Sequence, residues 1–189
     1  MPTVRYCLVC RKKWLTNVLR DWRRKAERTA RLNAVASYIT LSSVVYYASA
    51  IVLLHVLRTD FDPGHRYLSE YARGPYGALM TSTFFALSAG SLALSLGLWR
   101  SVSSKLRFLP GLLLWLIWAC AVFLAGIYTG DLQGTPRTQI GKIHDQMGMI
   151  AFPSATLALP LLSLALGWEK SWRSGFGLQT GLPRDATTE

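Results

Sequence analysis

Acidic residues and cysteines are scarce in this chain. Its 189 residues include 10 Asp or Glu, 21 Lys or Arg and 3 cysteines. Cys7 and Cys10 form one C-x-x-C pair, without the second ligand pair that a structural zinc site needs. Arg11 follows that pair, where a covalently attached haem would need histidine. These absences argue against a zinc-ribbon protein and against a c-type cytochrome.

Four long stretches also lack Asp, Glu, Lys and Arg throughout their interiors. They are residues 34–57, 77–99, 108–128 and 146–168. Each reaches the roughly 20 residues that a helix needs to cross about 30 Å of hydrocarbon. Because backbone groups in lipid must bond within their own segment, such stretches are helices. The sequence therefore predicts an all-α integral membrane protein, an up-down antiparallel four-helix bundle. The lack of ionisable groups within the spans argues against an ion-coupled transporter.

Basic charge is concentrated in alternate segments. Residues 1–33, residues 100–107 and the segment from residue 169 onward hold 16 of the 21 Lys and Arg. The positive-inside rule therefore places both termini in the cytoplasm. We predict a cytoplasmic arm over 1–33, a transmembrane domain over 34–168 and a cytoplasmic tail over 169–189 that is expected to be disordered. Without a recognition motif, this charge does not indicate nucleic-acid binding.

The arm carries an apolar stripe at helical spacing within residues 12–25, surrounded by Lys and Arg. Its members are Trp14, Leu15, Val18, Leu19 and Trp22. This pattern is typical of a basic amphipathic helix on anionic headgroups, so anionic lipids are the partner that it predicts. A solvated basic tail is the other interpretation. In the second span, Ala89, Ala93 and Gly97 form a small-residue face that favours close helix packing, within the chain or with a partner in the membrane.

The two outer linkers, residues 58–76 and 129–145, carry the residue types that chemistry needs. Antiparallel helices bring such linkers together at one end of a bundle. We therefore predict one polar site, built from Ser69, Glu70, Tyr71, Arg73, Asp131, His144 and Asp145. Glu70, His144 and Asp145 are the candidate catalytic residues, as general acid or base. In this site Arg73 neutralises Glu70 or Asp131, because an unpaired charge at the apolar edge is costly.

A purely structural interpretation uses the same residues. Arg66, Glu70 and Arg73 would form ion pairs along a short surface helix over 65–73, with Tyr67, Leu68 and Tyr71 facing the bilayer. Asp145 would then only favour the first turn of the fourth helix. We predict no cofactor. The alternatives left open are a divalent ion at His65, Glu70, Asp131 and His144, and a haem between His55 and His144, the only histidines that could pair.

The run Leu68–Gly77, LSEYARGPYG, followed by a span rich in small residues, resembles the bacterial membrane family catalogued as domain of unknown function 998. The pattern Gly141-x-x-His144-Asp145 fits the same family, and the resemblance covers residues 34–168. It implies a multi-pass protein of the bacterial plasma (inner) membrane without an established activity. Members usually have more than four spans, so we interpret this chain as a shortened member. The positions that match the family pattern are Ser69, Glu70, Tyr71, Gly74, Gly77, Gly141, His144 and Asp145.

Two classes of function follow. The first is a non-enzymatic membrane protein whose outer polar patch serves binding or structure. The second is a membrane-embedded enzyme that acts at the outer leaflet through a carboxylate/histidine acid-base or metal site. The enzyme requires Glu70, His144 and Asp145 to lie within a few ångströms of one another in a cavity. A scattered arrangement favours the first class.

Overall fold

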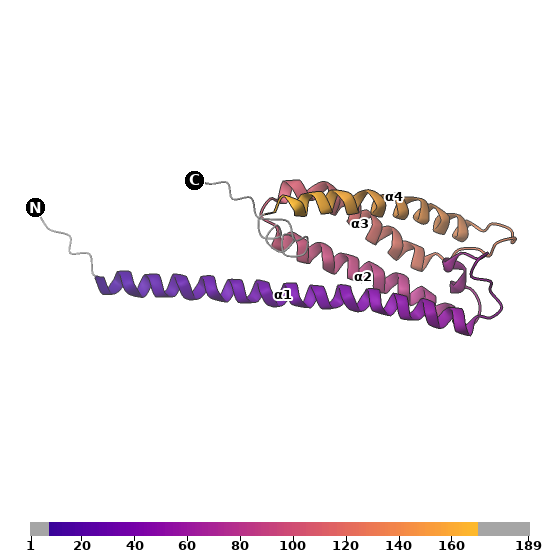
Figure 1. Cartoon of the computed structure of the whole chain (residues 1–189), viewed down its shortest axis with the longest axis horizontal. Coiled ribbons are helices and arrows are strands. Elements are labelled where there is room, and N and C mark those ends of the chain that lie inside the picture. Colours follow the sequence, from indigo (N-terminus) through magenta and orange to yellow (C-terminus); the bar gives the residue numbers. More distant parts are fainter. Residues whose placement is uncertain (1–7, 170–189) are drawn as a thin grey trace, which may run out of the picture.

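The computed structural model describes residues 8–169, and its elements there are helical. They are α1 (Leu8–Leu57), the 3-10 helix η1 (Leu68–Ala72), α2 (Gly77–Ser101), α3 (Lys105–Ile127) and α4 (Gln139–Gly167). Figure 1 shows the four long helices side by side, each reversing the direction of the one before. All four are long and apolar enough to cross a membrane. The predicted all-α, four-helix membrane fold is therefore confirmed.

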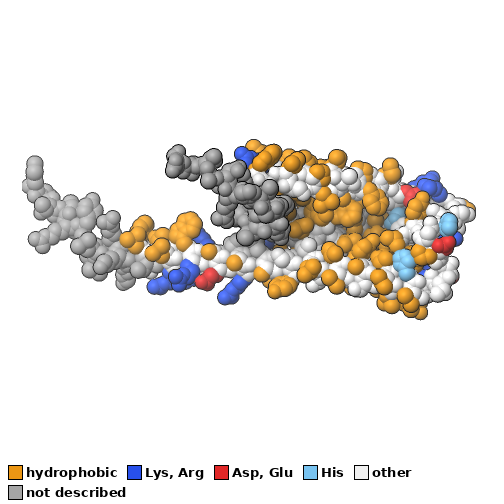
Figure 2. Space-filling model, viewed as in Figure 1, with side chains coloured by type: hydrophobic (Ala, Val, Ile, Leu, Met, Phe, Trp, Pro, Cys, Tyr) orange, Lys and Arg blue, Asp and Glu red, His pale blue; other side chains and the backbone are white. Residues whose placement is uncertain are grey.

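The helices pack mainly on their sequence neighbours. α1 packs on α2 and α3 on α4, while α2 and α3 share a less extensive contact. The molecule is thus two helix hairpins side by side, with α1 and α4 at opposite edges (Figure 1). Hydrophobic side chains cover the shafts of the helices and charged ones gather at the ends (Figure 2). This is the distribution that a lipid environment requires.

Small residues make the contact between α1 and α2. A Cβ at Gly90 would overlap the Ser43 hydroxyl, and the Thr40 hydroxyl donates to the Gly90 carbonyl at 3.0 Å. Of the predicted small-residue face, Gly97 lies beside Ala36 of α1 and Ala93 is buried, whereas Ala89 is exposed. The close-packed face of α2 therefore runs through Gly90 rather than Ala89.

α1 is a single helix that joins the predicted arm helix to the first span. Its residues include neither glycine nor proline, so nothing interrupts its backbone hydrogen bonds. Figure 1 shows the first half of α1 extending past the ends of the other helices. The stripe residues Trp14, Leu15, Leu19 and Trp22 are exposed there, and Val18 is half-buried. Their binding to anionic lipid stays a prediction. The predicted tail lies outside the described residues, apart from Glu169.

α4 begins about two turns before the predicted span. Thr138 caps it, because the Thr138 hydroxyl accepts the backbone N–H of Gly141 at 3.0 Å. His144 and Asp145 consequently lie within the helix rather than at its start. Residues 139–145 are too polar to register in a hydropathy pattern, which reports the hydrocarbon-spanning part of a helix and not its full length.

Candidate functional site at the outer end of the bundle

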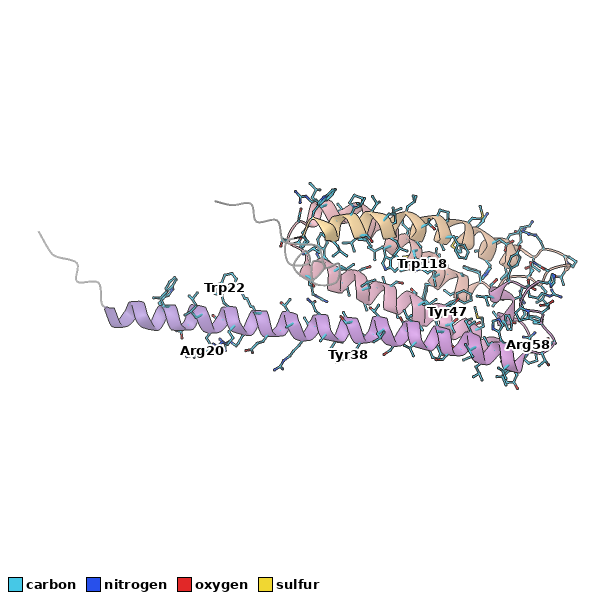
Figure 3. All side chains as sticks on the ribbon, in the orientation of Figure 1. Arg20, Trp22, Tyr38, Tyr47, Arg58 and Trp118 are labelled. Atoms are coloured by element: carbon cyan, nitrogen blue, oxygen red, sulfur yellow. The ribbon has the colours of Figure 1, made fainter. Side chains whose placement is uncertain are left out.

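Arg58, directly after the C-terminal end of α1, makes four side-chain hydrogen bonds and is only 4% exposed. Its Nε and Nη2 donate to the Asp60 carboxylate at 2.8 and 2.9 Å. Its Nη1 donates to the carbonyls of Arg73 at 2.6 Å and Pro75 at 3.1 Å. The guanidinium also lies 3.9 Å from the centre of the Phe61 ring. Arg58, labelled at this end of the bundle in Figure 3, therefore ties the end of α1 to the segment that leads into α2.

Glu70 lies in η1 and is 1% exposed. Its carboxylate accepts from Arg66 Nη1 at 3.1 Å and from the backbone N–H of Tyr67 at 3.2 Å. It also accepts from the backbone N–H of Gln133, at 3.3 Å, in the second outer linker. A buried carboxylate is stable only with such donors. Glu70 thereby joins the first hairpin to the second.

Arg73, at the C-terminal end of η1, also connects the first hairpin to the second. Its Nε donates to the Gly130 carbonyl at 2.8 Å, and its Nη2 donates to the Thr129 carbonyl at 3.2 Å. Nη2 also lies 3.4 Å from the Asp131 carboxylate. Of the two partners predicted for Arg73, the structure pairs it with Asp131, while Glu70 pairs with Arg66.

Asp131 organises the turn into α4. Its carboxylate accepts from the backbone N–H of Thr138 at 2.7 Å and from the Thr138 hydroxyl at 2.9 Å. The Thr138 N–H, helped by the hydroxyl and by the charge of Arg73, holds the pKa of Asp131 below its usual value. A Cβ at Gly141 would overlap this carboxylate, so the close approach of α4 requires glycine there.

His144 is buried against the end of α3. Its Nδ1 lies 2.7 Å from the Tyr128 carbonyl and 3.1 Å from the Ala125 carbonyl, so it must carry the proton and donate. The Phe84 ring meets the imidazole edge-on, with centroids 6.0 Å apart. His144 therefore satisfies two of the carbonyls that the end of α3 leaves free. It has no bonding partner in common with Glu70.

Asp145 and Tyr71, two further members of the predicted polar site, have different surroundings. Asp145 is exposed and pairs with the exposed Arg137. Tyr71 is fully buried beside Leu54 and Met80, and within the described part of the chain its hydroxyl has no hydrogen-bond partner. The interpretation that Tyr71 faces the bilayer is therefore wrong, because its ring fills the space beneath η1. Tyr67 does remain exposed.

The remaining candidates do not gather into a metal site. His65 bonds to Asp62 at 2.6 Å on the exposed surface of the first linker. His55 Nδ1 bonds instead to the Ile51 carbonyl within α1. No group of three His, Cys, Asp or Glu side chains that could hold a metal ion occurs among residues 8–169. Ser69, the last member of the predicted site, is half-buried in η1.

Arg58 is the residue that sequence reasoning missed. The signal that could have found it is an arginine directly after an apolar span with an aspartate two residues later. Such an arginine sits at the apolar edge and must find acceptors. We refer to residues 58–76 and 128–138, joined by Arg58, Glu70, Arg73 and Asp131, as the outer cap.

Comparison with known proteins gives one match. No curated protein and no solved structure matches the chain. Residues 40–182 match a protein family, and the match covers all of α2, α3 and α4 and the C-terminal part of α1. On that match, the chain belongs to the family described as Protein of unknown function (DUF998).

Proposed function

We propose that the protein is a non-enzymatic, multi-pass component of the bacterial plasma membrane whose outer cap braces the two helix hairpins against each other. One observation carries this proposal: the buried Glu70 and the half-buried Arg73 of the cap bond to the backbone of another segment. Glu70 accepts from Gln133, and Arg73 donates to Thr129 and Gly130. These bonds cross between the hairpins where the contact of α2 with α3 is less extensive than those within each hairpin.

The bonding of the three catalytic candidates supports structure over chemistry. Glu70 is held by Arg66 and Gln133, His144 by the carbonyls of Ala125 and Tyr128, and Asp145 by Arg137. An acid-base pair must reach one substrate from both sides, within hydrogen-bond distance of the transferred proton. Three residues committed to three different partners do not offer that arrangement.

The stability of an Arg73 variant tests the brace. Arg73→Gln removes two charged bonds to carbonyls from a side chain that is 38% exposed, so we expect a loss of about 1–2 kcal/mol after allowing for solvent. Arg137→Gln is the matched control, because its exposed ion pair with Asp145 should contribute less than about 0.5 kcal/mol. Thermal unfolding of Arg73→Gln that matches that of Arg137→Gln would contradict the brace.

The orientation forms part of the proposal. The 16 Lys and Arg in alternate segments support cytoplasmic termini, with the outer cap on the opposite side. Cysteines placed at Asp62 and Arg137 should react with an impermeant reagent added to intact cells. Labelling that needs permeabilised cells would reverse the topology.

Anionic lipids are the partner that we propose for the basic first half of α1. Its exposed Trp14, Leu19 and Trp22 lie among Lys and Arg, which supports binding to an anionic surface. A peptide of residues 8–33 should bind anionic vesicles and dissociate as salt rises. Binding that ignores lipid charge would remove the electrostatic basis of this partner.

A further inference from the structure

A groove opens at the inner end of the bundle, where α1 continues and α2 stops. The last bond between the two helices joins Asn33 Nδ2 to the Ser101 hydroxyl at 2.8 Å. Beyond that bond, α1 and the final turn of α2 border a space of about 570 Å³. We call it the inner groove. Its chief lining residues are Trp22, Lys25, Thr29, Asn33 and Arg100.

The inner groove has the chemistry of an anion site. Lys25 and Arg100 supply two positive charges, and the lining residues that the structure describes include no acid. Neither cation forms an ion pair with a carboxylate in the part of the chain that the structure describes. The Oδ1 atom of Asn33 is buried and has no hydrogen-bond partner among residues 8–169, which leaves an acceptor in need of a donor. An anion that also carries a hydroxyl satisfies both requirements.

The depth of the groove identifies the source of that anion. The Nζ of Lys105 lies 4.7 Å from the centre of the Trp99 ring, and the guanidinium of Arg107 lies 6.0 Å from the centre of the Trp168 ring. Tryptophan with nearby Lys or Arg marks the boundary between hydrocarbon and headgroups. Arg100 directly follows Trp99, so the groove lies at the level of the lipid phosphates.

We propose that the inner groove binds the headgroup of an anionic phospholipid with a hydroxylated head, of the phosphatidylglycerol class. The phosphate oxygens accept from Lys25 and Arg100, and a headgroup hydroxyl donates to Asn33 Oδ1. The exposed indole of Trp22, about three turns beyond Asn33 on the aqueous side, borders the outer edge of the headgroup. Basic pockets beside transmembrane helices recognise lipid headgroups in this way. The assignment to the inner leaflet, but not the binding chemistry, rests on the orientation proposed above.

Native mass spectrometry of the delipidated full-length protein, titrated with phosphatidylglycerol or phosphatidylcholine, tests the charge recognition. The double variant Lys25→Gln/Arg100→Gln should bind phosphatidylglycerol about thirtyfold more weakly than the unaltered protein. The control, Arg20→Gln/Arg28→Gln, removes equal charge from α1 outside the groove lining, and Figure 3 places Arg20 on the projecting part of the helix. This control variant should weaken the binding of phosphatidylglycerol several-fold less than Lys25→Gln/Arg100→Gln does. Equal losses in the two double variants, or equal binding of phosphatidylcholine, would overturn the proposal.

Two further arms test the ligand itself. The protein should bind phosphatidylglycerol about fivefold more tightly than phosphatidylmethanol, which has the same charge but no headgroup hydroxyl. Asn33→Ala should abolish that preference for phosphatidylglycerol. If the unaltered protein binds the two lipids equally, the role of Asn33 is refuted. Inorganic phosphate should not displace the lipid at equal concentration. Displacement would identify a soluble phosphate as the ligand and overturn the lipid assignment. These measurements use purified protein, so their outcome does not depend on the orientation of the protein in the membrane or on the stability of the outer cap.

Discussion

Replacing Arg58 by glutamine should destabilise the protein more than any other single loss of charge in the first outer linker. The substitution removes two bonds to the carbonyls of Arg73 and Pro75, at 2.6 and 3.1 Å. Hydrogen bonds to charged groups contribute roughly 1.5–3 kcal/mol each, and the guanidinium over Phe61 adds about 1 kcal/mol. Burying the guanidinium offsets part of this gain. The Asp60 side chain is 60% exposed, so water replaces its arginine at little cost.

The net expected loss is about 3 kcal/mol, or roughly 6–12 °C in the midpoint of thermal unfolding for a chain of this size. The assay is the unfolding of the detergent-solubilised protein, followed by tryptophan fluorescence. Arg137→Gln is the control, since it removes the same group from a side chain that is 70% exposed. A midpoint for Arg58→Gln within about 2 °C of the control, below the change that 1 kcal/mol produces, would refute the assignment of Arg58 as the tie between α1 and α2.

Two further predictions concern Asp131 and its neighbours. Gly141→Ala should lower the stability of the protein by about 1–3 kcal/mol, because the added Cβ overlaps the Asp131 carboxylate. Gly148→Ala is the control, since Gly148 in the same helix has room for a Cβ. Equal unfolding midpoints for the two variants would contradict this packing. The pKa of Asp131 is lowered in the folded protein, so its contribution is complete above the unfolded value of about 3.9 and is lost as pH falls through the folded value. The unfolding midpoint should therefore fall at acid pH, less steeply in Asp131→Asn, and identical acid slopes would exclude this role.

The sequence predicted the membrane spans well because hydrocarbon imposes one strict requirement, a long uncharged helix. It did not predict where these helices end outside the lipid. α1 continues through the arm because nothing between Leu8 and Leu57 breaks a helix, and the absence of Gly and Pro was the available signal. α4 starts early because Thr138 caps it, a local signal that hydropathy does not report.

The candidate site was harder to predict, because its bonds depend on which backbone groups the fold brings near each charge. The sequence identified Arg73 as a residue that needs a carboxylate, but it could not choose between Glu70 and Asp131. It also could not show that two of the three hydrogen bonds of Arg73 would go to the carbonyls of Thr129 and Gly130. Likewise, the carbonyls that hold His144 belong to the end of α3, far from it in sequence.

The brace is tested most directly by the stability of Glu70→Gln. An amide can replace only one carboxylate oxygen as acceptor, and its NH₂ group then faces a donor, either Arg66 or a backbone N–H. We predict a loss of about 2–3 kcal/mol, measured as a lower midpoint of thermal unfolding than in the unaltered protein. Active-site carboxylates behave in the opposite way, since their removal commonly leaves stability unchanged or raises it. An unchanged or higher midpoint for Glu70→Gln would contradict the brace and favour a catalytic outer site.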